Sequence, residues 1–203
     1  MMRRRRRSER GTNFVEMALV VPLLLTLMLG IFEVGMMFRS DIAIANATRT
    51  AARTGSTAGK APTADFQILS SLSAALGSVK NATVNYVVIY KVTGSTNAVP
   101  AACTSAAHGN AANFCNTYSA ADLSAILANP VSAQTSYGGS CAGAGKDTKW
   151  CPTTRVVDQG ATNGPDYLGV AISLTVPTFT RLVGTTKTFN DRFTMRLDPS
   201  GLG

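Results

Sequence analysis

The sequence predicts an α+β protein, in which a long N-terminal membrane helix precedes a small disulfide-stapled domain of helices on an antiparallel sheet. Two observations carry this prediction. An arginine-rich stub runs into an apolar segment of membrane length, and the remainder mixes helical periodicity with strand alternation. We expect three parts: a basic segment over residues 1–11, a transmembrane and extended helix over 12–55, and an extracytoplasmic α+β domain over 56–203.

The basic stub predicts the orientation of the chain. It holds six arginines and one glutamate, so it carries +5 of the formal net charge of +8. Because basic flanks stay on the cytoplasmic side of a membrane segment, the C-terminal domain should lie outside the plasma (inner) membrane. No aromatic residues alternate with the arginines, so nucleic acid is not an expected partner. The arginines are Arg3, Arg4, Arg5, Arg6, Arg7 and Arg10.

The apolar segment from Phe14 to Phe38 is long enough to cross a bilayer. The stretch from Met17 to Phe38 would be about 33 Å long as a helix, at ~1.5 Å per residue. Pro22 removes a backbone donor within this segment, so we expect a kink or local unwinding there. The lipid bilayer is therefore an expected partner.

Two carboxylates interrupt the apolar segment. Glu16 lies near its beginning, where an acidic group at the bilayer centre would cost roughly 2.5–3.5 kcal/mol. We therefore expect another molecule to supply a positive partner for it. Glu33 lies near the outer end, and we expect it to extend to the membrane interface, with pairing to Arg39 or to a partner helix as alternatives.

Helical character continues beyond the membrane segment. The stretch from Phe38 to Arg53 contains no proline or glycine and is rich in alanine, a strong helix former. One continuous helix from Phe14 to Arg53 is therefore expected, ending at Gly55. A second helix should begin with Thr63 or Asp65 as its cap and end before Gly77.

The rest of the domain supplies strands, loops and a short helix. Alternating apolar residues predict strands over 84–92, 168–176 and 188–197, the last two joined as a hairpin. A short helix is expected from Ser119 to Ala128, ending at Asn129-Pro130. Residues 94–116 and the segment around Gly138-Gly139 have the composition of long irregular loops.

The four cysteines all fall in the extracytoplasmic part. Their wide spacing and the single histidine of the chain do not suit a zinc site, whereas two disulfides suit an oxidising compartment. Sequence alone permits three connectivities. We expect the local pairs, Cys103 with Cys115 and Cys141 with Cys151, each worth about 3 kcal/mol in the chain-entropy model. Trp150 should pack on a disulfide.

No residue pattern predicts an enzyme. Carboxylates such as Asp158 and Asp191 are scattered, without the pairing that acid–base catalysis requires. The lone His108 and the glycine pairs match no catalytic or phosphate-binding motif. We therefore expect no catalytic residues, no metal and no cofactor.

The N-terminal motif resembles a known family. Residues 10–23 read RGTNFVEMALVVPL and residues 30–35 read GIFEVG. This stretch is similar to the start of TadE-like pseudopilins of the tight-adherence (Tad) pilus systems, a branch of the type IV pili. The resemblance covers about residues 10–55. Its motif residues are the basic leader, Gly11, Glu16, Pro22 and the Glu33-x-Gly35 pair.

The resemblance implies a processing step and a structural role. A membrane prepilin peptidase would cut between Gly11 and Thr12, and the new ammonium of Thr12 would lie near Glu16 of a neighbouring subunit. Glu16 would then help to set the register between subunits. The implied partners are the peptidase, other pilin subunits and the Tad assembly machinery. Thr12 is not the phenylalanine common in major pilins, which favours a minor pilin acting in assembly, adhesion or secretion, located at the cell surface once assembled.

Two other interpretations stay open at this point. The chain could be a single-span surface-binding protein that keeps its anchor and joins no filament. Alternatively, signal peptidase could release a soluble secreted protein after Ala45 or Ala47, where small-x-small patterns occur. The mature N-terminus distinguishes the three.

Overall fold

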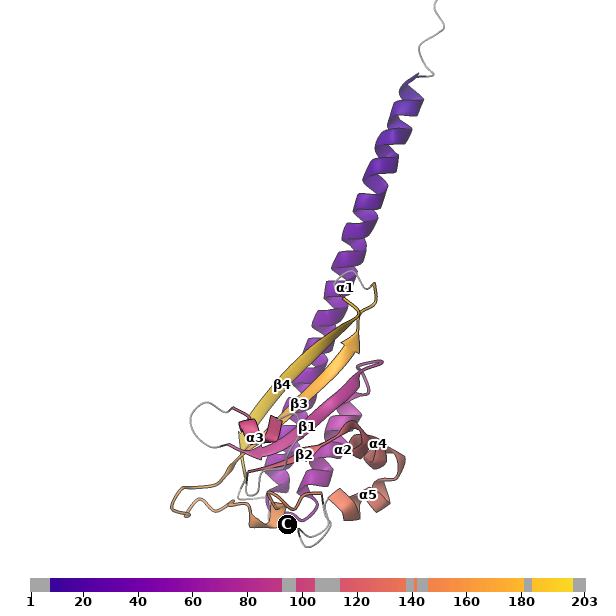
Figure 1. Cartoon of the computed structure of the whole chain (residues 1–203). Helices are drawn as coiled ribbons and strands as arrows, with labels where there is room; N and C mark the ends of the chain where they lie inside the picture. Colours follow the sequence, from indigo (N-terminus) through magenta and orange to yellow (C-terminus); the bar gives the residue numbers. More distant parts are fainter. Residues whose placement is uncertain are drawn as a thin grey trace, which may run out of the picture.

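The computed structural model describes residues 8–92, 98–104, 114–137, 141, 146–180 and 184–198, with side chains from residue 13 onward. One long helix rises out of a small α+β domain (Figure 1). The predicted fold class is confirmed. The helices are α1 Ser8–Ala58, α2 Ala64–Leu76, α3 Ala101–Thr104, α4 Ala120–Ala128, α5 Pro130–Tyr137 and a 3-10 turn at Pro152–Thr154; the strands are β1 Thr83–Lys91, β2 Cys115–Tyr118, β3 Tyr167–Pro177 and β4 Thr186–Arg196.

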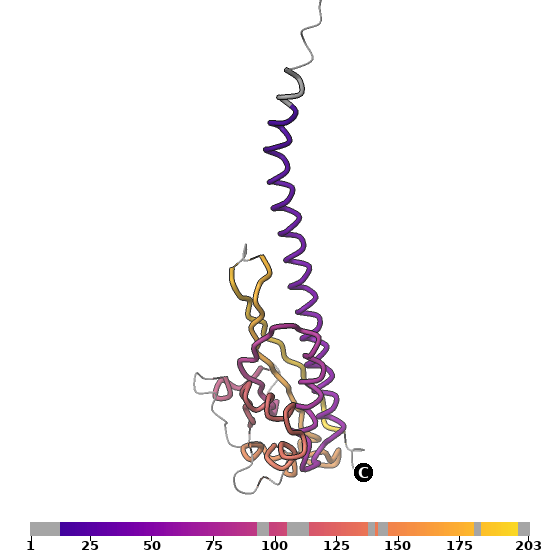
Figure 2. The backbone as a smooth tube through the Cα atoms, turned by 90° about the vertical axis from the view of Figure 1, so that its right-hand side faces the viewer, coloured from indigo at the N-terminus to yellow at the C-terminus, as the bar shows by residue number. Residues whose placement is uncertain are grey.

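Helix α1 is continuous and has two halves with different surroundings. Its N-terminal half stands clear of the domain, as the view turned by 90° also shows (Figure 2). Its C-terminal half packs on α2, β3 and β4. The expected local unwinding at Pro22 is wrong, because the helix runs through that residue without a break. The hydroxyl of Thr26 donates to the Pro22 carbonyl at 2.8 Å, within the same turn.

The predicted helix end at Gly55 is also wrong, since α1 continues to Ala58. Gly55 instead permits close packing, because a Cβ there would lie 2.7 Å from Ile68 Cδ1 and 2.9 Å from Leu168 Cδ2. The residue that ends the helix is Gly59, whose φ of +55° suits glycine. Its N–H donates to the Gly55 carbonyl at 3.1 Å.

Four antiparallel strands form one sheet in the order β2-β1-β3-β4. The predicted β3–β4 hairpin is confirmed. One face of the sheet carries Val87, Ile89 and Ile172 against α1 and α2 and forms the main core. The opposite face carries Val88 and Tyr90 in a smaller cluster that includes two cysteines. The second half of β1, residues 87–90, is therefore buried on both faces, which explains its continuous apolar run.

Four elements were missed in the sequence: the one-turn helix α3, strand β2, helix α5 and the 3-10 turn at Pro152–Thr154. Strand β2 occupies the end of the predicted 94–116 loop, and its Asn116 pairs with Ile89 of β1. Helix α5 begins at Pro130, directly after the end of α4. Proline suits the first turn of a helix, because its missing N–H would have no partner there. Within the loop, residues 93–97 and 105–113, which include His108, lie outside the described residues.

Gly169 of β3 makes a testable close contact. A Cβ at this position would lie 2.2 Å from Cζ of Tyr90, its cross-strand partner. We expect Gly169→Ala to lower the free energy of unfolding by about 1–3 kcal/mol, because the buried ring must move. Urea denaturation followed by Trp150 fluorescence measures this. Gly30→Ala, where a Cβ meets nothing within 4 Å, is the control; equal stability of all three proteins would contradict the prediction.

Candidate functional site

The N-terminal half of α1 is an exposed apolar rod. By length and composition it could cross a membrane, since the helix from Asn13 onward contains a long apolar stretch that is fully exposed. Side chains such as Phe14, Leu19 and Ile31 are 78%, 73% and 75% exposed. An apolar surface of this extent normally has a lipid or protein partner. The long apolar helix fits a single-pass membrane anchor.

Glu16 lies alone on this rod. Its side chain is exposed, between the exposed Val15 and Met17, and no ion pair to it occurs among the described residues. At this position the carboxylate is accessible to another molecule. Gly11 and Thr12 lie in the first turns of α1, one turn from Glu16. Arg10 also lies in this helix, whereas Arg3 to Arg7 lie outside the described residues.

The side chain of Glu33 is packed inward and does not extend outward into solvent, so the expected outward orientation is wrong. Its side chain is 1% exposed, buried between α1 and the domain. Neither carboxylate oxygen has a hydrogen-bond partner among the described residues, and the alternative ion pair with Arg39 does not occur there. Gly35, its motif partner, is exposed, and a Cβ added there would meet nothing within 4 Å.

The C-terminal half of α1 is bound tightly to the domain. Ile44, Ala47 and Ala51 are fully buried in the main core. At the helix end, the hydroxyl of Ser56 donates to the carbonyl of Arg196 at 2.5 Å, and the N–H of Asp198 donates to the carbonyl of Ser56 at 3.1 Å. The exposed rod is thus a direct extension of a core element.

A buried polar cluster joins α2 to β2 and to the segment after Cys151. Asp65 is fully buried and pairs with the fully buried Arg155 at 2.5 Å. Its other oxygen accepts from Tyr118 Oη and Asn116 Nδ2, each at 2.7 Å. Both Asp65 oxygens are therefore bonded, and Nη2 of Arg155 also donates to the Trp150 carbonyl at 3.3 Å, whereas Nε and Nη1 of Arg155 have no hydrogen-bond partner among the described residues. The sequence prediction of Asp65 as a helix cap missed this role; Thr63 occupies the N-cap position, without a side-chain capping bond.

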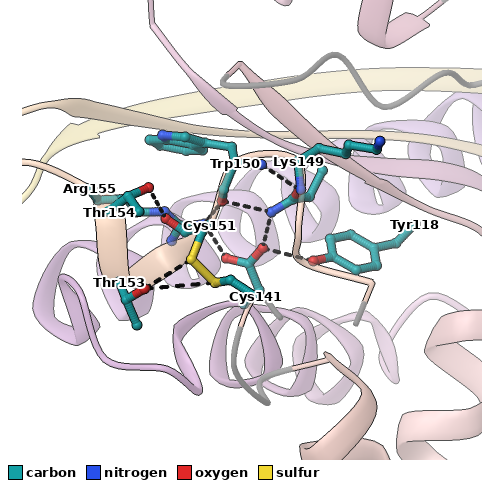
Figure 3. The surroundings of a disulfide bond; sticks show 10 residues. Tyr118, Cys141, Lys149, Trp150, Cys151, Thr153, Thr154 and Arg155 are labelled. Atoms are coloured by element: carbon teal, nitrogen blue, oxygen red, sulfur yellow. Dashed lines mark hydrogen bonds and ion pairs between the residues drawn. A yellow bond between two sulfur atoms is a disulfide. The ribbon is translucent and has the colours of Figure 1, made fainter. Parts of the chain in front are cut away.

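Trp150 lies against this cluster. The Arg155 guanidinium stacks over its ring at 4.2 Å from the centroid, and Asn116 bonds its backbone in both directions, at 2.9 Å each. In Figure 3 the indole lies away from the Cys141–Cys151 disulfide and toward the Arg155 side. The expectation that Trp150 packs on a disulfide is therefore wrong. The ring belongs to the main core and is 4% exposed.

Burial and charge shift the pKa values of two side chains around the cluster. Desolvation, reinforced by the Asp65 carboxylate, raises the pKa of Tyr118 well above its usual value. Desolvation, again with Asp65, raises the pKa of the buried Asp147 carboxyl. Both shifts favour the neutral form near the Asp65–Arg155 pair. The cluster is thus organised around the Asp65–Arg155 ion pair.

Helices α4 and α5 are joined by a second polar group. Ser119 and Asp122 form a capping box at the start of α4, and Tyr137 of α5 donates to Asp122 at 2.9 Å. Burial acts to raise the pKa of Asp122, but the hydrogen bonds from Ser119 and Tyr137 outweigh it and hold that pKa below its usual value. Burial and the bond to Asp122 raise the pKa of Tyr137 to about 12.

The cysteines lie in the expected local pairs. The Cα atoms of Cys103 and Cys115 are 6.3 Å apart and those of Cys141 and Cys151 are 5.4 Å apart, each within disulfide distance. The first pair attaches α3 to β2 in the smaller core cluster. The second closes the segment that precedes Arg155 (Figure 3). Both pairs therefore restrain segments that carry little regular secondary structure.

The comparisons with known proteins concern the helix. Residues 11–53 match the sequence model of the TadE-like protein family. No curated protein and no solved structure matches the chain. The match covers the exposed rod and the helical segment that packs on the sheet, and it ends before α2. Over residues 11–53 the N-terminal helix is therefore similar to the TadE-like family, as its motif predicted.

Proposed function

We propose that this chain is a minor pilin or pseudopilin of a Tad-type pilus. A prepilin peptidase cuts it after Gly11, and the exposed rod of α1 then exchanges lipid contacts for contacts with sister helices and the assembly machinery. The observation that carries the proposal is the coincidence of the family match with an exposed apolar rod in which Glu16 is an isolated, exposed carboxylate. The basic leader keeps the N-terminus in the cytoplasm and the domain outside the inner membrane.

Glu16 supplies the assembly contact in this proposal. After cleavage, the ammonium of Thr12 in one subunit pairs with Glu16 of the next, away from water. Each charge then has a partner, and a subunit that lacks one of them leaves the other unpaired at a cost of about 3–5 kcal/mol. This penalty favours one register over the others. The domain decorates the filament and carries no chemistry of its own.

The packing of α1 disfavours release by signal peptidase. A cut after Ala45 or Ala47 would fall inside the helical segment that packs on the sheet, where Ala47 is 0% exposed. It would also separate Ile44, likewise 0% exposed, from the core that it fills. A protease that requires an extended substrate would have to unfold this part of the domain first.

The mature N-terminus tests the proposal. We expect the chain expressed with a prepilin peptidase in bacterial membranes to begin at Thr12, and Gly11→Leu to stay uncut, because the enlarged side chain blocks the position before the scissile bond. Gly35→Leu, a glycine of the same helix with open space around it, is the control and should still be cut. N-terminal sequencing decides: an intact Met1 or Met2 supports the anchored non-filament protein, and a start near Asn46 or Thr48 supports secretion.

A further inference from the structure

Glu33 borders a pocket that the proposed assembly role does not use. The pocket has a volume of about 580 Å³ and lies between α1, the α2–β1 connection and the β3–β4 hairpin. Glu33 lines it, and the side chain is 99% buried, with both oxygens unpartnered among the described residues. A buried carboxylate without a hydrogen bond or a counter-ion is costly, and buried polar atoms almost always have a partner. A cationic donor in the pocket would supply the missing partner.

The rest of the lining has the opposite charge and an apolar wall. Arg39, Lys80 and Lys187 line the pocket with exposed side chains, and none of them forms an ion pair among the described residues. Phe179 and Phe189 supply aromatic surface. One inner negative charge beside three outer positive charges complements a zwitterion that carries an ammonium group and a phosphate within a few ångströms of each other.

The position of the pocket indicates the source of such a zwitterion. The side chains of residues 13–29 are exposed, and Glu33 is the first buried residue of α1, so the pocket begins where the apolar rod meets the domain. The ring of Phe179, which is 73% exposed, contacts Phe32 of the rod with their centroids 5.7 Å apart. Exposed aromatic rings at such a boundary are typical of the headgroup level of a bilayer. A lipid whose chains lie along the rod would place its headgroup at this pocket.

We propose that the pocket binds the headgroup of a phospholipid with a primary ammonium, of the phosphatidylethanolamine class. The ammonium donates hydrogen bonds to the Glu33 carboxylate, and Arg39, Lys80 and Lys187 bind the phosphate. Phosphatidylcholine has no N–H to donate, and phosphatidylglycerol has no cation to place beside Glu33. The volume is within the range of small-molecule sites. This inference rests on the membrane anchor and not on cleavage or pilus assembly.

Lipid retention by the full-length chain tests the proposal. The purified protein, in detergent, is titrated with palmitoyl-oleoyl phosphatidylethanolamine, phosphatidylcholine or phosphatidylglycerol, and bound lipid is counted by native mass spectrometry. We expect phosphatidylethanolamine to bind at least about tenfold more tightly than phosphatidylcholine, the ratio given by one charge-assisted hydrogen bond. Glu33→Gln should abolish this preference. Asp41→Asn, which removes an exposed carboxylate from the same helix, should retain it.

A second variant separates the phosphate contacts from the ammonium contact. Lys187→Ala should weaken phosphatidylethanolamine and phosphatidylglycerol alike while leaving the preference for the primary ammonium over choline. Unchanged Trp150 fluorescence verifies that each variant is folded. The proposal is overturned by equal binding of the three lipids, by a preference that survives Glu33→Gln, or by a Glu33-dependent dimer without lipid, which would make a second copy the occupant. None of these outcomes bears on cleavage after Gly11, so the two proposals fail separately.

Discussion

Asp65→Ala should lower the free energy of unfolding by about 3–5 kcal/mol, because it leaves the fully buried guanidinium of Arg155 without its counter-ion. Tyr118 and Asn116 lose an acceptor in the same substitution. A loss of this size is a large fraction of the roughly 5–15 kcal/mol that stabilises a typical domain. At a slope of about 2 kcal/mol per molar urea, the unfolding midpoint should fall by roughly 1.5–2.5 M.

The chain contains its own probe for this measurement. Trp150 is the single tryptophan, and it stacks on Arg155 within the affected cluster. Its fluorescence in a urea titration of the full-length protein in detergent therefore reports directly on the cluster. Asp41→Ala, an exposed carboxylate on α1, is the matched control and should change stability by no more than about 0.5 kcal/mol. Similar midpoints for the two variants would show that the Asp65–Arg155 pair does not hold α2 to the rest of the domain.

Glu16→Val should abolish incorporation into pili while leaving the protein cut and in the membrane. Valine makes the rod more apolar, so insertion is maintained, but the ammonium of a neighbouring Thr12 loses its counter-ion. A penalty of about 3–5 kcal/mol at each subunit contact corresponds to a decrease in assembly of at least about 100-fold. Immunoblots of sheared surface fractions measure assembly, and N-terminal sequencing of the membrane fraction verifies cleavage.

Two companion variants make the Glu16 result specific. Glu16→Asp keeps the charge on a shorter side chain and should restore part of the assembly. Asp41→Val removes another exposed carboxylate of α1 and should assemble normally. If Glu16→Val subunits appear in sheared pili at the wild-type level, the carboxylate does not set the register between subunits, and the anchored non-filament interpretation gains.

Local patterns were sufficient for the elements that carry strong periodicity. Alanine-rich and apolar spacing predicted α1 and α2, and alternation predicted β1 and the β3–β4 hairpin. Strand β2 was missed because it has only four residues and lies in a segment of turn-like composition. The helix end at Gly55 was misplaced because glycine has two roles, as a helix terminator and as a site of close contact, and only the packing of Ile68 and Leu168 decides between them.

The candidate sites also differ in how far the local sequence reveals them. Glu16 could be found from the sequence because a charge inside an apolar run is a local anomaly. The Asp65–Arg155 pair could not, since its members are 90 positions apart and neither belongs to a motif. Glu33 was found but given the wrong environment, because the hairpin that buries it comes from residues 167–196. The signal that was available for α5 was Pro130, which favours a helix start as much as a stop.

Helix α1 runs without a break from the exposed rod into the core, so the rod and the domain are rigidly connected. A force or torque on the N-terminal half is transmitted to the sheet through the packing of Ile44 and Ala51 and through the Ser56–Arg196 hydrogen bond. The helix between them is continuous, so no flexible linker absorbs it. The domain therefore keeps a fixed distance and orientation relative to the membrane or the filament that holds the rod. A force large enough to move the rod relative to the domain must therefore also expose the core.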